Sequence, residues 1–71
     1  MRTGSLVRIR ANTSVEANGA ENTFVHIPSG TVGIIIKSKQ PTPNLPVGSA
    51  LVRFEFCESY FYWRQLEIIN E

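Results

Sequence analysis

The feature that most constrains this chain is the alternation of apolar and polar residues in short segments rich in β-branched side chains. In the segment Leu6–Ala11, the apolar Val7 and Ile9 fall on one side of an extended chain. Arg8 and Arg10 fall on the other side. A strict period of two is typical of a half-buried strand, because successive side chains point to opposite faces of a sheet. The sequence therefore predicts a first strand with one buried and one exposed face.

Four further segments complete the predicted set of strands. They are Thr31–Lys37, Ala50–Phe56, the aromatic run Tyr60–Trp63 and a short last strand at Glu67–Ile69. Residues Arg64–Leu66 are expected to form one tight helical turn before the last strand. Gly33, in the middle of its strand, indicates a bulge, a bend or the close approach of another segment. The expected core consists of Val7, Ile9, Val32, Ile34, Ile36, Val52, Phe54, Leu66 and Ile68.

The segments between the strands are polar or rich in proline. Residues Asn12–Ser29 have too few apolar positions for a stable amphipathic helix, so we expect a loop with at most one helical turn near Val15–Ala17. Loops of that length are often functional. Gln40–Gly48 carries three prolines, which do not suit a central strand, and is predicted to be an extended hairpin loop. A shorter turn is expected at Cys57–Ser59.

A chain of 71 residues is long enough for one domain. Five short strands, a long first loop and a tight turn before the last strand predict an all-β fold, a small SH3-like barrel spanning residues 1–71. Closure suits so short a chain because it leaves few unpaired strand edges. An oligonucleotide-binding barrel is the alternative, but such barrels usually need a helix between the third and fourth strands. No segment of this sequence suits that helix.

Single residues limit the chemistry that is open to the chain. Cys57 is the only cysteine, so the sequence offers neither an internal disulfide nor a structural zinc site and favours a reducing, cytoplasmic setting. Glu58 beside it is expected to raise the pKa of its thiol and make it less reactive. His26, the only histidine, has no neighbouring cysteine or aspartate with which to act as a catalyst. We therefore expect a protein that is not an enzyme and has no cofactor, metal ion or membrane span.

Two groups of residues are candidates for binding a partner. The first is a set of outward-facing cations on neighbouring strands: Arg8, Arg10, Lys37, Lys39 and Arg53. Together these side chains could bind phosphates or the carboxylates of a protein, or they could simply keep an outer sheet face soluble. The second group is the aromatic run. Alternation buries only half of it, so either Tyr60 and Tyr62 or Phe61 and Trp63 should lie toward the surface, where aromatic side chains often anchor interfaces.

Short segments of the chain resemble known families. Arg2–Ile9, Gly30–Val32 and Val52–Phe54 are similar to strands of photosystem I subunit IV. Asn44–Pro46, Leu51–Phe54 and Arg64–Ile69 follow the order seen in the variable chain of ferredoxin–thioredoxin reductase, and the ferredoxin-docking subunit of the photosynthetic NAD(P)H dehydrogenase-like complex ends in a similar strand. Residues Asn12–Ser29 depart from all three families, and Val47–Ser49 is an insertion relative to the reductase chain. Gly30–Gly33 followed by Ile34 resembles the core of KOW motifs.

The resemblances imply two different functions. The photosynthetic families imply a non-catalytic accessory subunit that docks on a larger complex, in several cases near the binding site of acidic ferredoxin. Such a protein would be cytoplasmic or peripheral on the cytoplasmic side of a membrane complex. The KOW motif implies a nucleic-acid-binding module. The formal net charge of only +1 favours protein docking, because proteins that bind nucleic acid are usually strongly basic. Arg8, Arg10, Lys37, Lys39, Arg53, Tyr60, Tyr62 and Trp63 are the predicted partner-binding residues.

Overall fold

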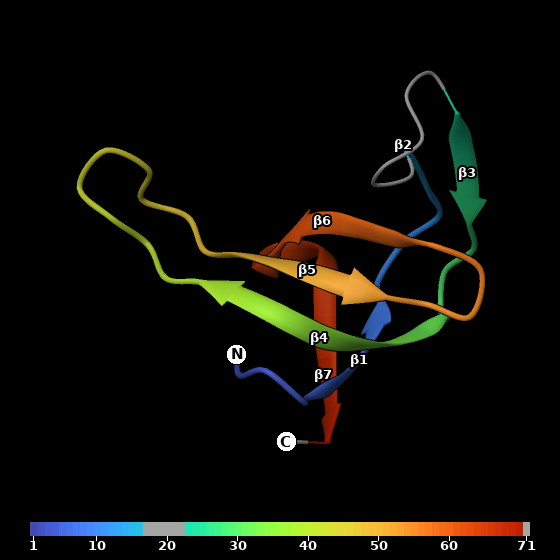
Figure 1. The fold of residues 1–71 in the computed structure, drawn as a ribbon, viewed down its shortest axis with the longest axis horizontal. Helices are drawn as coiled ribbons and strands as arrows, with labels where there is room; N and C mark the ends of the chain where they lie inside the picture. The colour runs from blue at the N-terminus through green and yellow to red at the C-terminus, as the bar shows by residue number, and fades with distance from the viewer. Residues whose placement is uncertain (17–22, 71) are drawn as a thin grey trace.

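Short strands joined by turns make up the fold in a computed structural model, which describes residues 1–16 and 23–70 (Figure 1). The elements in these residues are β1 (Leu6–Ile9), β2 (Thr13–Glu16), β3 (Phe24–Ile27), β4 (Val32–Lys39), β5 (Ser49–Arg53), β6 (Glu58–Tyr62), a 3-10 turn η1 (Trp63–Gln65) and β7 (Leu66–Asn70). The predicted tight turn before the last strand is thus present, one residue earlier than expected. The all-β class is confirmed.

Five of the strands form one antiparallel sheet in the order β6-β5-β4-β1-β7. Strands β4, β5 and β6 follow one another as hairpins, and the 3-10 turn then brings β7 back beside β1. In Figure 1, β1 and β7 cross behind β4 and β5, so the sheet bends over on itself. Strands β2 and β3 form a separate hairpin that extends away from this sheet. This arrangement agrees with the predicted small, barrel-like fold.

The core lies on the concave side of the bent sheet. Its buried hydrophobic side chains are Val7, Ile9, Ile27, Ile35, Ala50, Val52, Phe54, Phe61 and Leu66. Phe54 and Phe61 meet edge to face, with ring centroids 5.8 Å apart and planes at 79°. This is a favourable geometry for two aromatic rings. The prediction is confirmed for Val7, Ile9, Val52, Phe54 and Leu66, which come from β1, β5, β7 and the residue after β5.

The face predicted to be buried in β4 is wrong by one residue. Ile35 is fully buried, whereas Val32 and Ile34 are 51% and 37% exposed and Ile36 is half-buried. The reason lies at Gly33, which is itself buried against β5. A Cβ atom at Gly33 would lie 2.6 Å from Cγ1 of Val52 and 2.9 Å from the carbonyl oxygen of Arg53. The strands approach so closely that only glycine fits on the inner side.

One other residue of the predicted core is exposed, and so is one residue outside that set. Ile68 lies opposite the buried Val7 but is 40% exposed, because β7 is the last strand of the sheet. Phe56, which alternation placed on the core side of a longer strand, is also exposed. Strand β5 ends at Arg53, where a turn begins that is closed by a hydrogen bond of 2.8 Å from the amide of Phe54 to the carbonyl of Cys57. β6 therefore starts at Glu58, inside the turn expected at 57–59.

The long segment after β1 is not simply a loop, as had been predicted. It contains β2 and β3, which pair from Thr13 opposite Ile27 to Glu16 opposite Phe24. Ile27 is fully buried, and Val15 and Val25 pack against the core. The strands were missed because β2 has one aliphatic residue, Val15, and β3 has apolar residues on both of its sides, so neither alternates clearly. The helical turn expected near Val15 is replaced by strand, and the part of that prediction at Ala17 lies outside the described residues.

We expect Gly33→Ala to destabilise the fold by about 1–3 kcal/mol, because the added methyl group must displace β5 or its side chains. Urea unfolding followed by circular dichroism measures the free energy of unfolding. Val32→Ile is the matched control, because it adds one methyl group on the exposed side of the same strand and should change stability by less than about 0.5 kcal/mol. Equal stability of the G33A variant and the wild type would contradict the close approach of β4 and β5.

Candidate functional site

Most of the predicted contact residues lie on the outer face of the five-stranded sheet, because residues opposite one another in a ladder project to the same side. Three rows cross the strands. The rows are Leu6–Ile34–Arg53–Glu58, Lys37–Leu51–Tyr60 and Lys39–Ser49–Tyr62. Arg8 lies opposite both Val32 and Glu67, beside the first row. This outer face therefore carries cations, tyrosines and several apolar side chains.

An exposed apolar strip lies where β1 and β4 pair. It consists of Leu6, Val32 and Ile34, of which Leu6 is 38% exposed. Leu6 and Ile34 are direct cross-strand partners, and Val32 is two residues from Ile34 on the same side of β4. The sequence analysis placed Val32 and Ile34 in the core and so did not identify this surface. Contiguous exposed apolar side chains of this kind often mark interaction sites.

Ion pairs stand on both sides of the apolar strip. The Arg8 guanidinium donates to the Glu67 carboxylate, and the Arg10 guanidinium lies 3.9 Å from the same carboxylate and donates to the carbonyl of Leu66. On the other side, Arg53 donates twice to Glu58 Oε1, at 3.0 and 3.2 Å. The predicted cations do face outward, but carboxylates are interleaved with the arginines. They do not form a uniformly basic face.

Arg8 and Arg10 change the pKa of the Glu67 carboxyl. The hydrogen bond from Arg8, followed by the charge of Arg8, lowers the pKa of the Glu67 carboxyl below its usual value. Desolvation acts in the opposite direction, and the charge of Arg10 adds to the lowering. The folded state therefore favours the ionised carboxylate more than the unfolded chain does.

The pH dependence of stability should report this pair. Because the pKa of Glu67 is lower in the folded state, its contribution to stability is complete above the unfolded pKa and is lost as pH falls through the folded value. We expect the melting temperature of the wild type to fall more between pH 7 and about pH 3 than that of Glu67→Gln. Glu55→Gln is the control, since it makes the same chemical change at an exposed residue that has no ion pair among the described residues. Matching curves for E67Q and the wild type would contradict the assignment.

The aromatic run follows the first of the two predicted alternatives. Tyr60 and Tyr62 are 45% and 44% exposed, whereas Phe61 is buried in the core. Trp63 is half-buried and packs against the core. Its indole N–H donates to the carbonyl of Ser49 at 3.0 Å, and its ring lies against Gly48 so closely that a Cβ atom there would overlap it. Trp63 therefore contributes to the packing of the domain.

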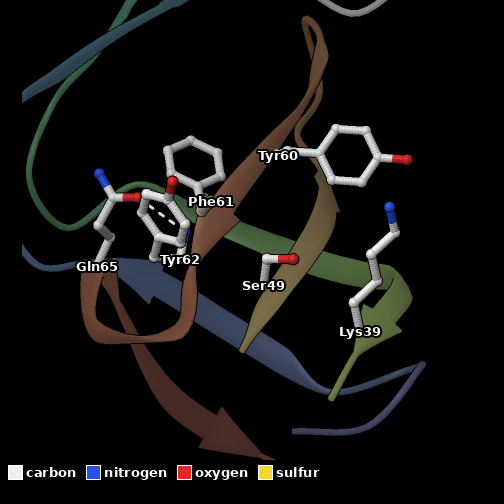
Figure 2. A pocket seen from close by; sticks show the side chains of 6 residues that line it. All are labelled: Lys39, Ser49, Tyr60, Phe61, Tyr62 and Gln65. Atoms are coloured by element: carbon white, nitrogen blue, oxygen red, sulfur yellow. Dashed lines mark hydrogen bonds between the residues drawn. The ribbon is translucent and has the colours of Figure 1, made fainter. Parts of the chain in front are cut away.

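A shallow hollow of about 350 Å³ opens on the outer face between the two exposed tyrosines (Figure 2). We call it the Ser49 notch, and it is lined by Lys39, Ser49, Tyr60, Phe61, Tyr62 and Gln65. In Figure 2 the Tyr60 and Lys39 side chains stand on one side of Ser49, and Tyr62 and Gln65 on the other. Gln65 Oε1 accepts a hydrogen bond of 2.9 Å from the amide of Tyr62, which fixes that side.

Cations lie over both tyrosine rings of the Ser49 notch. Lys39 Nζ is 5.5 Å from the centroid of Tyr60, and Arg64 Cζ is 5.4 Å from the centroid of Tyr62. Such cation–π contacts hold the long side chains near the rings while leaving their N–H groups available to other acceptors. Sequence reasoning identified Lys39 and the tyrosines but missed Ser49, Arg64 and Gln65. The strand register brings Ser49 beside Lys39 and Tyr62, and the 3-10 turn that follows Tyr62 places Arg64 and Gln65 beside it.

The residues considered for catalysis are placed apart. His26 is exposed on β3, in the separate hairpin. Burial raises the pKa of the Cys57 thiol, so the predicted direction agrees, but its cause is desolvation and not the charge of Glu58. Within residues 1–16 and 23–70, histidine, cysteine, aspartate and glutamate side chains do not cluster in threes that could hold a metal ion. No helix among the described residues has the length and apolar character to cross a membrane.

Comparisons of the chain with protein-family models, curated proteins and solved structures found no significant match. The resemblances to photosynthetic accessory subunits and to KOW motifs therefore stay predictions from short segments.

Proposed function

We propose that this domain is a non-catalytic docking module that binds another protein through the outer face of its sheet. The apolar strip is the single observation that carries the proposal. Leu6, Val32 and Ile34 keep 37–51% of their surface exposed on two strands that pair directly. A small domain with its own complete core gains nothing in stability from leaving such side chains in water.

The surroundings of the apolar strip suit a protein interface. Protein interfaces combine an apolar centre that becomes fully buried with a polar rim that stays partly solvated. Here the Arg8–Glu67 pair lies at one border of the strip, and the Arg53–Glu58 pair lies at the other. Internally paired charges can lie at a rim with little loss, because they need no partner from the other protein.

The same ion pairs argue against the KOW-like alternative. A nucleic-acid-binding face gains affinity by neutralising phosphates with free lysines and arginines. Glu67 already contacts Arg8, and Glu58 already contacts Arg53, so a phosphate approaching either arginine would meet a carboxylate. We therefore favour protein docking over nucleic-acid binding. A place in a ferredoxin-dependent photosynthetic complex, as the family resemblances imply, is the finer form of this proposal.

The test compares partner capture by two variants. Val32→Thr combined with Ile34→Thr removes apolar contact from the strip but keeps β-branched side chains that suit a strand. We expect the tagged wild type to retain a protein from an extract of its native cells and the double variant to lose at least nine tenths of it. Phe24→Ser is the matched control, because Phe24 is 70% exposed but lies on the separate hairpin. Melting curves of all variants establish that they fold.

A second measurement decides between the two classes of partner. The purified domain is titrated with duplex DNA, single-stranded DNA and RNA at about 0.15 M salt, which screens exposed charges beyond ~8 Å. Weak or no binding is expected. Micromolar or tighter binding that Arg8→Gln combined with Arg53→Gln abolishes would overturn the docking proposal, as would equal capture of the protein by the double threonine variant and the wild type.

A further inference from the structure

We propose that the Ser49 notch binds a carboxylate side chain of the partner protein, next to an apolar residue of the same segment. The inference rests on the proposed docking function, because the notch lies on the same outer face as the apolar strip. It adds to that function a defined pocket and the chemistry of the residue that enters it.

The shape of the notch follows from one small residue between large ones. Ser49 in β5 lies opposite Lys39 of β4 on one side and Tyr62 of β6 on the other. In the next row, Lys37–Leu51–Tyr60, the central residue is a leucine instead of a serine. Leu51 points outward but is buried between the side chains beside it. The floor at Ser49 is therefore lower than the surface around it.

Two groups that line the notch, the Lys39 ammonium and the Ser49 hydroxyl, are hydrogen-bond donors without an acceptor among the described residues. No carboxylate of these residues lies within ion-pair distance of Lys39 or of the nearby Arg64. The indole of Trp63 donates to the backbone carbonyl of Ser49 and leaves its hydroxyl free. A hydroxyl and an ammonium on neighbouring strands can donate together to one carboxylate. This combination differs from the arginines elsewhere on the face, which already have such partners.

The side chains that form the walls of the notch favour an acidic peptide segment over a nucleobase as the ligand. Tyr60 and Tyr62 present ring edges and hydroxyl groups, while cations lie over their faces. A nucleobase that stacked on the ring face covered by Lys39 or Arg64 would have to displace that cation. A carboxylate at Ser49 needs no such displacement, and an apolar neighbour can contact the ring edges. Because Lys39 and the apolar strip lie at opposite ends of β4, a partner segment that runs along this strand can reach both.

The test uses the whole domain, labelled with nitrogen-15, and a short blocked peptide in which Asp and Glu alternate with Leu and Phe. The matched probe replaces each acid with its amide, Asn or Gln, and a third probe is a short oligouridylate. We expect the acidic peptide to shift the backbone amide signals of Ser49, Tyr60 and Tyr62, with affinity at least fivefold higher than that of the amide peptide. The difference in affinity between the acidic and the amide peptide should become smaller at 0.5 M salt, because an ion pair at Lys39 would be exposed to solvent.

Three variants locate the site. Lys39→Gln and Ser49→Val should each weaken binding of the acidic peptide by about threefold to tenfold, the first by removing the charge and the second by removing the donor while retaining a strand-forming side chain. Lys37→Gln is the matched control, because it removes an identical charge from the same face of the same strand but does not line the notch. It should change the affinity by less than twofold.

Each other result overturns the inference. No shift at Ser49 up to millimolar peptide, equal binding of the amide peptide, or tighter binding of oligouridylate would each exclude a carboxylate pocket. Equal losses for K37Q and K39Q would indicate general electrostatic attraction instead of a defined site. The docking function is tested separately, by measuring how much of the native partner the V32T/I34T variant captures. If the strip variant loses the partner while K39Q and S49V retain it, docking stands and the notch proposal fails.

Discussion

The close approach of β4 and β5 at Gly33 determines both the inside and the outside of this domain. Because only a glycine fits between β4 and the backbone of Arg53, the side of β4 that carries Gly33 and Ile35 faces the core. Side chains alternate along a strand, so Val32 and Ile34 are directed outward beside Leu6. The tight packing that completes the core is thus also the reason that the apolar strip lies in water.

The sequence was sufficient to predict the class of fold, because alternation marks β1, β4 and β5 clearly. It did not show which face of β4 is buried, since isoleucines occupy both faces and polar residues do not mark either face as the exposed one. Gly33 indicated a close approach of another segment. However, a glycine has no side chain, so the core face of β4 contains fewer apolar side chains than the outer face. Counting apolar residues therefore favoured the wrong face. The hairpin of β2 and β3 was missed for a different reason, because β2 has only one aliphatic residue and β3 has apolar residues on both of its sides.

The candidate site was predictable in its ingredients but not in its arrangement. The arginines and tyrosines were identified from the faces of single strands. Whether the arginines are free or paired depends on two glutamates. Glu67, which pairs with Arg8, is far from it in the sequence, and Glu58, which pairs with Arg53, belongs to the neighbouring strand. A shift of one residue in pairing would place these carboxylates on the opposite face. Ser49 carried no signal of its own, because a small polar residue becomes a notch only when Lys39 and Tyr62 stand beside it.

The outer face is divided into regions that would act on a partner in different ways. Burial of Leu6, Val32 and Ile34 would supply free energy without direction, because the hydrophobic effect depends on area. The arginine–glutamate pairs would add little to affinity, since each charge is already satisfied. Among residues 1–16 and 23–70, no carboxylate pairs with Lys39 or Arg64 at one end of the face, so a partner with a carboxylate at one end of its apolar surface would bind in only one orientation. Charge complementarity of this kind fixes register more than it raises affinity.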